Sequence, residues 1–264
     1  AWTYDIRLSA ISVSRVDGAI ISKNIIGNIF NYTDYYVACG IIVGTGVVNC
    51  LISENQIGSI RSTTGGSCGI ALSNSQSSAN VNISKNTIAA IATSNASSYG
   101  IYINTPTGVT LEKNKINGIL NTELFYSGAA FGIYVESSVS NAGDFIISNN
   151  FVTDIKDAST ASNFTMTGGT GIGVYGIGNF KVYNNSVHLY GTLNGDIGET
   201  IHSAFATYYY DFDVSVDLRN NIFVNTFDNT NSVSDVSYAI YCFAPSTVFT
   251  EIDFNDYYVS GNAG

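Results

Sequence analysis

Few side chains in this sequence suit acid–base or metal chemistry. Five of these few stand at matching positions of a sequence repeat. The 264 residues include 10 Lys and Arg and 20 Asp and Glu, so charged residues make up only 11%. Five of them stand at matching places before an Asn in "KVYNN", "DLRNN" and "EIDFN": Lys181, Asp217, Arg219, Glu251 and Asp253. Carboxylates grouped in this way could bind Ca²⁺ beside a basic side chain. The alternative is compensated surface charge without chemistry, which is the ordinary role of neighbouring opposite charges.

This charged patch forms only if an internal repeat places its members side by side. "ISKNIIG" at residue 21 returns as "ISENQIG" at 52 and "ISKNTIA" at 83, each time 31 residues further on. The Asn recurs along the chain at intervals of 28 to 36 residues: Asn24, Asn55, Asn86, Asn114, Asn150, Asn185, Asn221 and Asn255. An aliphatic residue stands three positions before each Asn and an apolar residue two positions after it. The repeat therefore marks one corner of successive structural units.

A second motif recurs in phase with the Asn and indicates strands. "CGIIV" becomes "CGIAL", "YGIYI", "FGIYV" and "TGIGV" further along. Its apolar residues alternate, which is the period of a strand with one buried face. Each repeat holds about three such strands, so the sequence predicts an all-β parallel β-helix of about eight coils. We expect one domain over residues 1–264, either a segment of a longer chain or a filament subunit.

The Asn at each corner has a physical explanation in this fold. An inward amide is costly to bury unless the same amide lies above and below it and can hydrogen-bond to it. A surface turn would need no such stacking. The phase of the Asn with the aliphatic columns favours an inward Asn ladder.

These repeats resemble the right-handed parallel β-helix superfamily, which includes pectate lyases, phage tailspikes and many secreted surface proteins. More narrowly, "LRNNIFVN", "SYAIY" and "IDFNDYYVSG" are similar to large repetitive surface proteins of secreting Gram-negative bacteria. The resemblance implies a right-handed coil and a secreted or cell-surface location. In lyases of this fold it implies catalysis on the outer face of one sheet, with Ca²⁺-binding carboxylates and an Arg or Lys base.

The strand of the second motif carries no acid or base on its predicted outer face. We expect the small residue of "GIYI" and the residue two later to face outward, giving an apolar strip that suits an interaction surface. Three tyrosines of the strip could stack on a sugar ring or contact a protein partner: Tyr102, Tyr134 and Tyr241. Cys39 and Cys68 are expected at one inward position of adjacent coils, as a disulfide or as two free thiols.

The net charge of the chain narrows the classes of partner it could bind. The net charge of −10 argues against nucleic acid or an anionic membrane as partner. We therefore predict a non-catalytic structural or adhesive β-helix, stacking on itself end to end or laterally, or packing on other surface proteins. This reading needs no cofactor. The alternative is a polysaccharide-binding or polysaccharide-degrading β-helix that uses the tyrosines and the charged patch, with Ca²⁺ as its cofactor.

Overall fold

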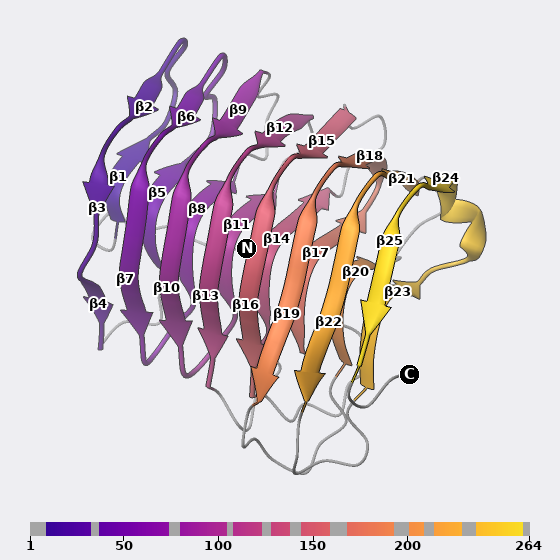
Figure 1. Ribbon diagram of the computed structural model, residues 1–264. Coiled ribbons are helices and arrows are strands. Elements are labelled where there is room, and N and C mark those ends of the chain that lie inside the picture. The colour runs from indigo at the N-terminus through magenta and orange to yellow at the C-terminus, as the bar shows by residue number, and fades with distance from the viewer. Residues whose placement is uncertain are drawn as a thin grey trace.

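The computed structural model describes residues 9–32, 37–73, 80–104, 108–122, 128–137, 144–158, 168–192, 201–208, 214–228 and 236–260. They form a parallel β-helix whose coils stack along one axis, with a strand from each coil in each of three sheets (Figure 1). The predicted all-β solenoid is thus confirmed. The described helical segment is the short 3₁₀ turn η2 (Ser246–Val248). Among the described residues no helix is long and apolar enough to cross a membrane.

The three sheets run side by side along the axis. The first sheet contains β1 (Ser9–Val13), β5 (Ala38–Val43), β8 (Ser67–Ser73), β11 (Ser98–Asn104), β14 (Ala130–Ser137), β17 (Gly169–Gly176), β20 (Ile201–Tyr208) and β23 (Val236–Phe243). The second contains β2 (Ile20–Ser22), β6 (Leu51–Ser53), β9 (Val81–Ser84), β12 (Val109–Glu112), β15 (Asp144–Ser148), β18 (Gly178–Tyr183), β21 (Val214–Arg219) and β24 (Phe249–Asp253). The third contains β3 (Ile25–Ile26), β4 (Ile29–Asn31), β7 (Gln56–Ser62), β10 (Thr87–Thr93), β13 (Lys115–Asn121), β16 (Phe151–Asp157), β19 (Ser186–Thr192), β22 (Ile222–Asp228) and β25 (Asp256–Val259).

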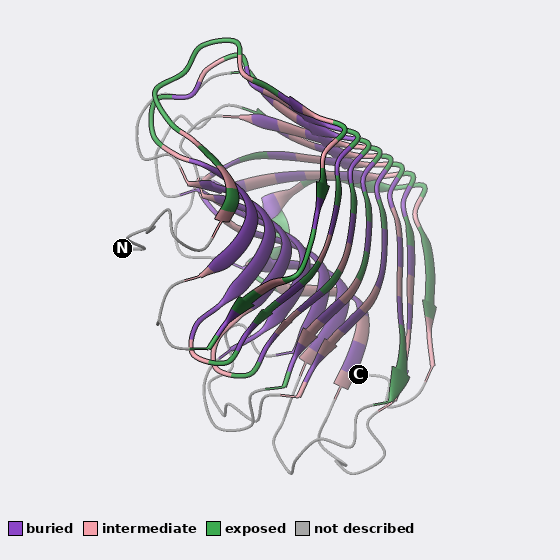
Figure 2. Cartoon of the chain, turned by 90° about the vertical axis from the view of Figure 1, so that its left-hand side faces the viewer, coloured by how far each residue is buried: buried purple, intermediate pink, exposed green. Residues whose placement is uncertain are grey.

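Aliphatic columns fill the space between the sheets. Ile52, for example, pairs with Ile83, which pairs with Leu111, and all three side chains are buried in one continuous core. Viewed along the stack, buried segments line the inside of every coil (Figure 2). Each fully buried aliphatic side chain contributes about 1.5–3 kcal/mol. Because each coil covers its neighbours, that burial is available only to the stack.

The Asn residues form the predicted ladder at the corner between the second and third sheets. At the centre of the rod, the backbone N–H and the Nδ2 of Asn86 both donate to Oδ1 of Asn114, at 3.0 Å each. Nδ2 of Asn114 in turn donates to the carbonyl of Ile83, at 2.8 Å. The same three bonds recur at every junction from Asn24 to Asn255. Each buried amide is therefore satisfied by the coil on either side.

The residue before each ladder Asn turns the chain through a left-handed conformation. Its φ lies between 54° and 59° in Lys23, Glu54, Lys85, Lys113, Asn149, Asn184, Asn220 and Phe254. Asn tolerates this region better than most residues, whereas a bulky aromatic such as Phe254 is strained there.

A second left-handed residue explains a feature of the repeat. Four positions after the ladder Asn, positive φ values recur in the first five coils, at Asn28, Ser59, Ala90, Gly118 and Asp154. Because of this kink, the next inward-facing residue comes three positions after the last one and not two. Ile60 and Ile91 therefore face the core five positions after their Asn. In β19 the kink is absent, and Leu189 is buried four positions after Asn185.

The predicted facing of the second motif was wrong at its small residue. A Cβ placed on Gly40 would lie 2.6 Å from Cγ2 of Ile57, inside the core, and not on the outer face. Gly40 and Ile41 thus both face inward, and alternation slips by one residue. The same slip puts Cys39 and Cys68 on the outer face, where they belong to a separate apolar cluster. The residue two after the glycine, such as Ile42, does face outward as predicted.

The ladder predicts a large cost for removing one central amide. Asn114→Ala should lower the free energy of unfolding by about 3 kcal/mol, because it removes the acceptor of the buried Asn86 backbone N–H and the donor to the Ile83 carbonyl in the preceding coil. Urea denaturation measures this. Asn117→Ala, on the exposed side of β13, the strand that follows the corner, is the matched control and should cost under about 0.5 kcal/mol. Equal losses in the two variants would contradict the ladder's role.

The third-sheet kink predicts two substitutions of opposite sign. Gly118 has φ +65° and room for a methyl group, since the nearest atom to its Cβ would be 3.4 Å away. Gly118→Ala should therefore cost about 1 kcal/mol through backbone strain alone. Ala90→Gly relieves the same strain at φ +55° and should gain about 0.5 kcal/mol after the entropy cost of glycine. Thermal unfolding of both variants checks the signs, and a stabilising Gly118→Ala would refute the explanation.

Candidate functional site

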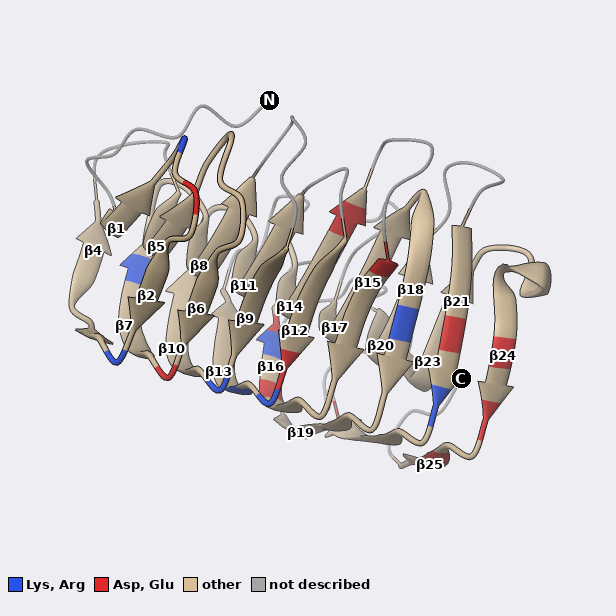
Figure 3. Cartoon of the chain, turned by 90° about the horizontal axis from the view of Figure 1, so that it is seen from above, with Lys and Arg blue, Asp and Glu red and all other residues tan. Residues whose placement is uncertain are grey.

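The five predicted charged residues lie together on the outer face of the second sheet, near its C-terminal end (Figure 3). Strand register pairs Lys181 with Asp217 and Asp217 with Glu251. A second row pairs Tyr183 with Arg219 and Arg219 with Asp253. The predicted clustering is therefore confirmed, and Tyr183 joins it.

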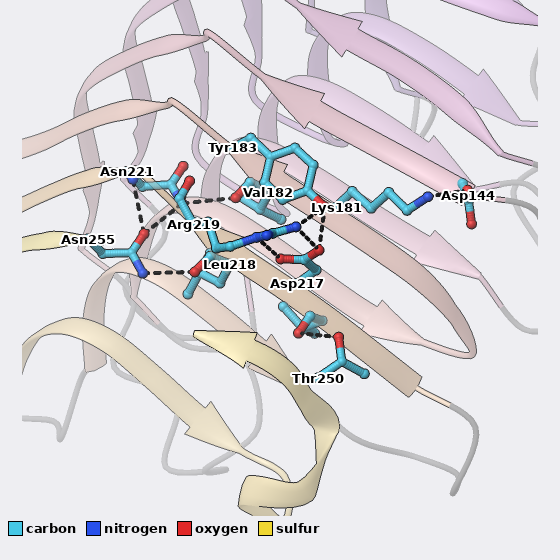
Figure 4. Close-up of polar contacts among 11 residues, drawn as sticks. Asp144, Lys181, Val182, Tyr183, Asp217, Leu218, Arg219, Asn221, Thr250 and Asn255 are labelled. Carbon is cyan, nitrogen blue, oxygen red and sulfur yellow. Dashed lines mark hydrogen bonds and ion pairs between the residues drawn. The ribbon is translucent and has the colours of Figure 1, made fainter. Parts of the chain in front are cut away.

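Arg219 and Asp217 form the centre of the patch, on one strand (Figure 4). The guanidinium donates from Nε to Oδ1 at 2.7 Å and from Nη2 to Oδ2 at 2.6 Å. The hydroxyl of Tyr183 also donates to Oδ2 of Asp217. The guanidinium carbon lies 5.2 Å from the centre of the Tyr183 ring, within range of a cation–π interaction. Three hydrogen bonds to the Asp217 carboxylate and one face of the Tyr183 ring are thus used within the patch.

Lys181 pairs with an acid on β15, the strand on the other side of β18 from β21. Its Nζ lies 2.5 Å from Oδ2 of Asp144 on β15, an acid that the sequence did not single out. A hydrogen bond to Asp144, helped by its negative charge, raises the pKa of Lys181. The hydrogen bond to Asp217 likewise raises the pKa of Arg219 above its already high ordinary value. Partial burial pushes the pKa of Asp217 up, but the hydrogen bonds from Arg219 and Tyr183 outweigh it and hold that pKa below its ordinary value.

The last coil contributes acids that have no ion-pair partner among the described residues. Glu251 and Asp253 are both exposed on β24. Oδ1 of Asp253 accepts the backbone N–H of Phe254 at 2.8 Å. Within the described part of the chain, no group of three or more His, Cys, Asp or Glu side chains is arranged to hold a metal ion.

This arrangement favours charge compensation over proton transfer. A general base must spend an appreciable fraction of its time unprotonated near the working pH. The raised pKa values of Lys181 and Arg219 make that form rarer for both. Their paired acids also occupy one contact of the Lys181 ammonium and the Nε and Nη2 donors of the Arg219 guanidinium.

Two of the three predicted contact tyrosines are covered. Tyr102 and Tyr134 face outward from the first sheet, as predicted, but are only 5% and 4% exposed. Their rings stack on each other with centroids 6.0 Å apart, and the Tyr102 hydroxyl donates to Oε2 of Glu136 at 3.1 Å. Burial raises the pKa of Tyr134 well above its ordinary value. Neither ring face is open to a sugar in this structure.

Tyr241 differs from these two, because it is only half-buried. Its ring lies 5.3 Å from that of Tyr238 and 6.4 Å from that of Phe243, which is exposed. These three rings of β23 form an accessible aromatic group on the outer face of the first sheet.

The two outer-face cysteines are neighbours in register. Cys39 pairs with Cys68 across β5 and β8, and both are free thiols in this structure. The Cys68 Sγ donates to the carbonyl of Ile70 at 3.1 Å. Burial raises the pKa of the Cys68 thiol well above its ordinary value, which disfavours the reactive thiolate.

Sequence reasoning missed a second polar column, at the corner between the third and first sheets. Seven positions after the ladder Asn, a buried polar residue recurs at Ser62, Thr93, Asn121 and Asp157. Nδ2 of Asn121 donates to Oδ1 of Asp157 at 2.8 Å, and the backbone N–H of Gly168 donates to its Oδ2 at 2.8 Å. The sequence does carry a signal for this column, because each repeat has a polar residue seven positions after the ladder Asn. The signal is weak because the type of that residue changes from coil to coil.

The patch predicts a pH-dependent contribution to stability. A carboxyl whose pKa falls on folding stabilises the fold above its unfolded pKa, and that stability is lost as pH falls through the folded pKa. Asp217→Asn should therefore lower stability at neutral pH, by under about 1 kcal/mol for so exposed a pair. The difference from the unsubstituted protein should shrink as the pH falls below the ordinary Asp value of 3.8 and disappear once the pH is below the lowered pKa of folded Asp217.

Urea denaturation across a pH series measures this difference. Glu251→Gln, the next residue in the same column, is the control and should change stability little at any pH. A difference between Asp217→Asn and the unsubstituted protein that persists at low pH would show that carboxylate charge is not its source.

Comparison with protein-family models, with curated proteins and with solved structures gives no match for this chain. The fold is therefore assigned from the strand pairing of the chain itself, and function must be argued from the geometry of its outer faces.

Proposed function

We propose that this protein is a non-catalytic β-helix that serves as a structural or adhesive shaft, secreted or held at a bacterial cell surface. The observation that carries the proposal is that both cations of the patch are already paired with acids. Arg219 is held by Asp217 and Lys181 by Asp144, so the two cations that a lyase mechanism would need as bases are already paired. The residues that most resembled catalytic groups are better suited to stabilising the outer face.

The ladder supports a mechanical role. Hydrogen bonds run without a break from Asn24 to Asn255, and the core columns follow the same axis. Local opening of a coil would therefore expose amides and aliphatic side chains of both neighbouring coils. Because that exposure is costly, we expect the rod to be stiff along its length. Low charge and the resemblance to repetitive surface β-helix proteins favour an extracellular setting and membership of that superfamily.

A polysaccharide-binding role is the second candidate, and the aromatic group of β23 favours it. Exposed Phe243 beside half-buried Tyr241 and Tyr238 offers ring faces of the kind on which sugars stack. This role needs no catalytic residue and is compatible with a shaft that adheres to glycan.

Incubation with acidic polysaccharides tests the proposal. We expect neither the ultraviolet absorbance of unsaturated products, which a lyase creates, nor new reducing ends, which a hydrolase creates. Affinity electrophoresis in the same polysaccharides tests adhesion. Tyr241→Ala should reduce any retardation of the protein by the polysaccharide. Tyr134→Ala is the matched comparison and should leave the retardation unchanged, because the ring of Tyr134 is covered.

Cleavage that is abolished by Lys181→Ala or Arg219→Ala would overturn the proposal and place a catalytic base in the patch. Electron microscopy of native material, with the intact mass of the chain, tests the shaft directly. Rod-shaped particles or fibres on intact cells are expected, and a protein confined to the cell interior would contradict the extracellular role.

A further inference from the structure

Cys39 and Cys68 face each other across a junction between two coils inside the rod. Their strands, β5 and β8, pair in parallel with these two residues directly opposite. Each strand has a further partner, β1 on one side and β11 on the other, so the junction is internal. The positions on either side in the same column hold Ser9 and Tyr99. Both cysteine side chains belong to the apolar cluster of the outer face and are 0% and 1% exposed.

The spacing of the two cysteines suits a disulfide. Neighbouring strands of a sheet lie about 4.8 Å apart, and disulfides join Cα atoms that are about 4.4–6.8 Å apart. Both side chains leave the sheet on the same face. A hydrogen bond already joins the Cys39 side chain to the Cys68 thiol. Bond formation therefore requires side-chain rotation and not a movement of the backbone.

The other two cysteines lie elsewhere in the fold. Cys50 belongs to the core between the sheets. Cys242 lies on β23, the last described strand of the first sheet, and is paired in register with Thr207. These two thiols therefore provide an internal comparison, because neither is placed opposite another cysteine.

A bond between Cys39 and Cys68 would close one coil into a covalent ring. The two residues are 29 positions apart, and the chain between them runs once around the solenoid through β6 and β7. Hydrogen bonds and side-chain packing are the contacts that otherwise join one coil to the next. A cross-link at this place would keep the coil closed even where those contacts open, and it would restrict the unfolded chain.

We propose that Cys39 and Cys68 form a disulfide that cross-links the coil of β5 to the coil of β8. The inference rests on the proposed secreted or cell-surface location, because disulfides form and persist in oxidising compartments. The oxidant is a small-molecule or protein disulfide. One cysteine thiolate attacks it and releases one thiol, and the second cysteine thiolate then attacks the mixed disulfide and releases the other. The chain thereby loses two electrons and two protons, which the oxidant takes up as it becomes two thiols.

Burial determines when this exchange takes place. In the folded chain both thiols are covered, and burial raises the pKa of Cys68, which disfavours its thiolate. Exchange is therefore fastest during folding, before the apolar cluster closes over the two sulfur atoms. The two free thiols of the structure describe the reduced chain. Once formed, the bond is shielded from reductants by the same cluster.

Export of the full chain to a bacterial periplasm tests the bond, because that compartment is oxidising whatever the natural location of the protein. The purified chain is denatured and its free thiols are alkylated with iodoacetamide. Of the four cysteines, we expect Cys50 and Cys242 to be alkylated and one peptide pair to join Cys39 to Cys68. Cys39→Ala should also free Cys68 for alkylation. Alkylation of all four cysteines in the exported chain, or a bond between another pair, would overturn the inference.

The effect of the bond on unfolding is a second measurement. The midpoint of thermal unfolding should be about 5–10 °C higher for the oxidised chain than for the reduced chain. Cys242→Ala should keep this difference, and Cys39→Ala should abolish it. Stretched from its termini, the oxidised chain should reach a length about 10 nm shorter than the reduced chain, because the ring cannot extend. Equal lengths would contradict the cross-link.

Failure of this inference and failure of the shaft proposal give different results. Four free thiols in the exported chain overturn the disulfide and leave the shaft proposal standing. Cleavage of polysaccharide, or confinement of the natural protein to the cell interior, contradicts the shaft proposal and leaves the alkylation result of the exported chain unchanged.

Discussion

The hydrogen bond between ladder asparagines is the constraint on which the rest of this structure depends. A corner between two sheets brings backbone and side-chain polar groups into an apolar interior, where an unpaired amide costs roughly 1–3 kcal/mol. Placing the same residue at the same corner of every coil lets each amide satisfy its neighbours, as Asn86 and Asn114 do. That requirement fixes the left-handed residue before the Asn and the aliphatic columns on both sides of it.

The same requirement confines chemistry to the outer faces. Most inward positions repeat an aliphatic residue or Asn from coil to coil, so they offer little freedom to assemble a site of differing residues. Outward positions vary, but parallel register brings the outward residues of successive coils close together. Lys181, Asp217 and Glu251 stand in one such column. Unlike charges brought this close compensate one another unless burial or a ligand prevents it, and Asp217 with Arg219 illustrates the outcome.

The inward columns whose residue types repeat could be predicted from the sequence, and so could the register that gathers the charged patch, but the facing and burial of individual side chains could not. An Asn like Asn24 and an aliphatic residue like Ile21 recur at each corner with a constant spacing between them, so the sequence predicts the coil. The slip at Gly40 escaped prediction, because a local change of strand conformation leaves the spacing of residues unchanged. The burial of Tyr134 also escaped it, since cover by neighbouring rings such as that of Phe131 is a property of packing and not of phase.

Direction along the rod follows from the ladder. From Asn24 to Asn255, every junction runs from the backbone N–H of one Asn to Oδ1 of the Asn in the following coil. The two neighbours of any one Asn therefore depend on its side chain unequally. Without the Asn114 amide, Asn86 in the preceding coil loses the acceptor of its backbone N–H, whereas Oδ1 of Asn150 in the following coil keeps the Asn114 backbone N–H as a donor. The stability of each corner is thus set mainly by the side chain of the coil that follows it.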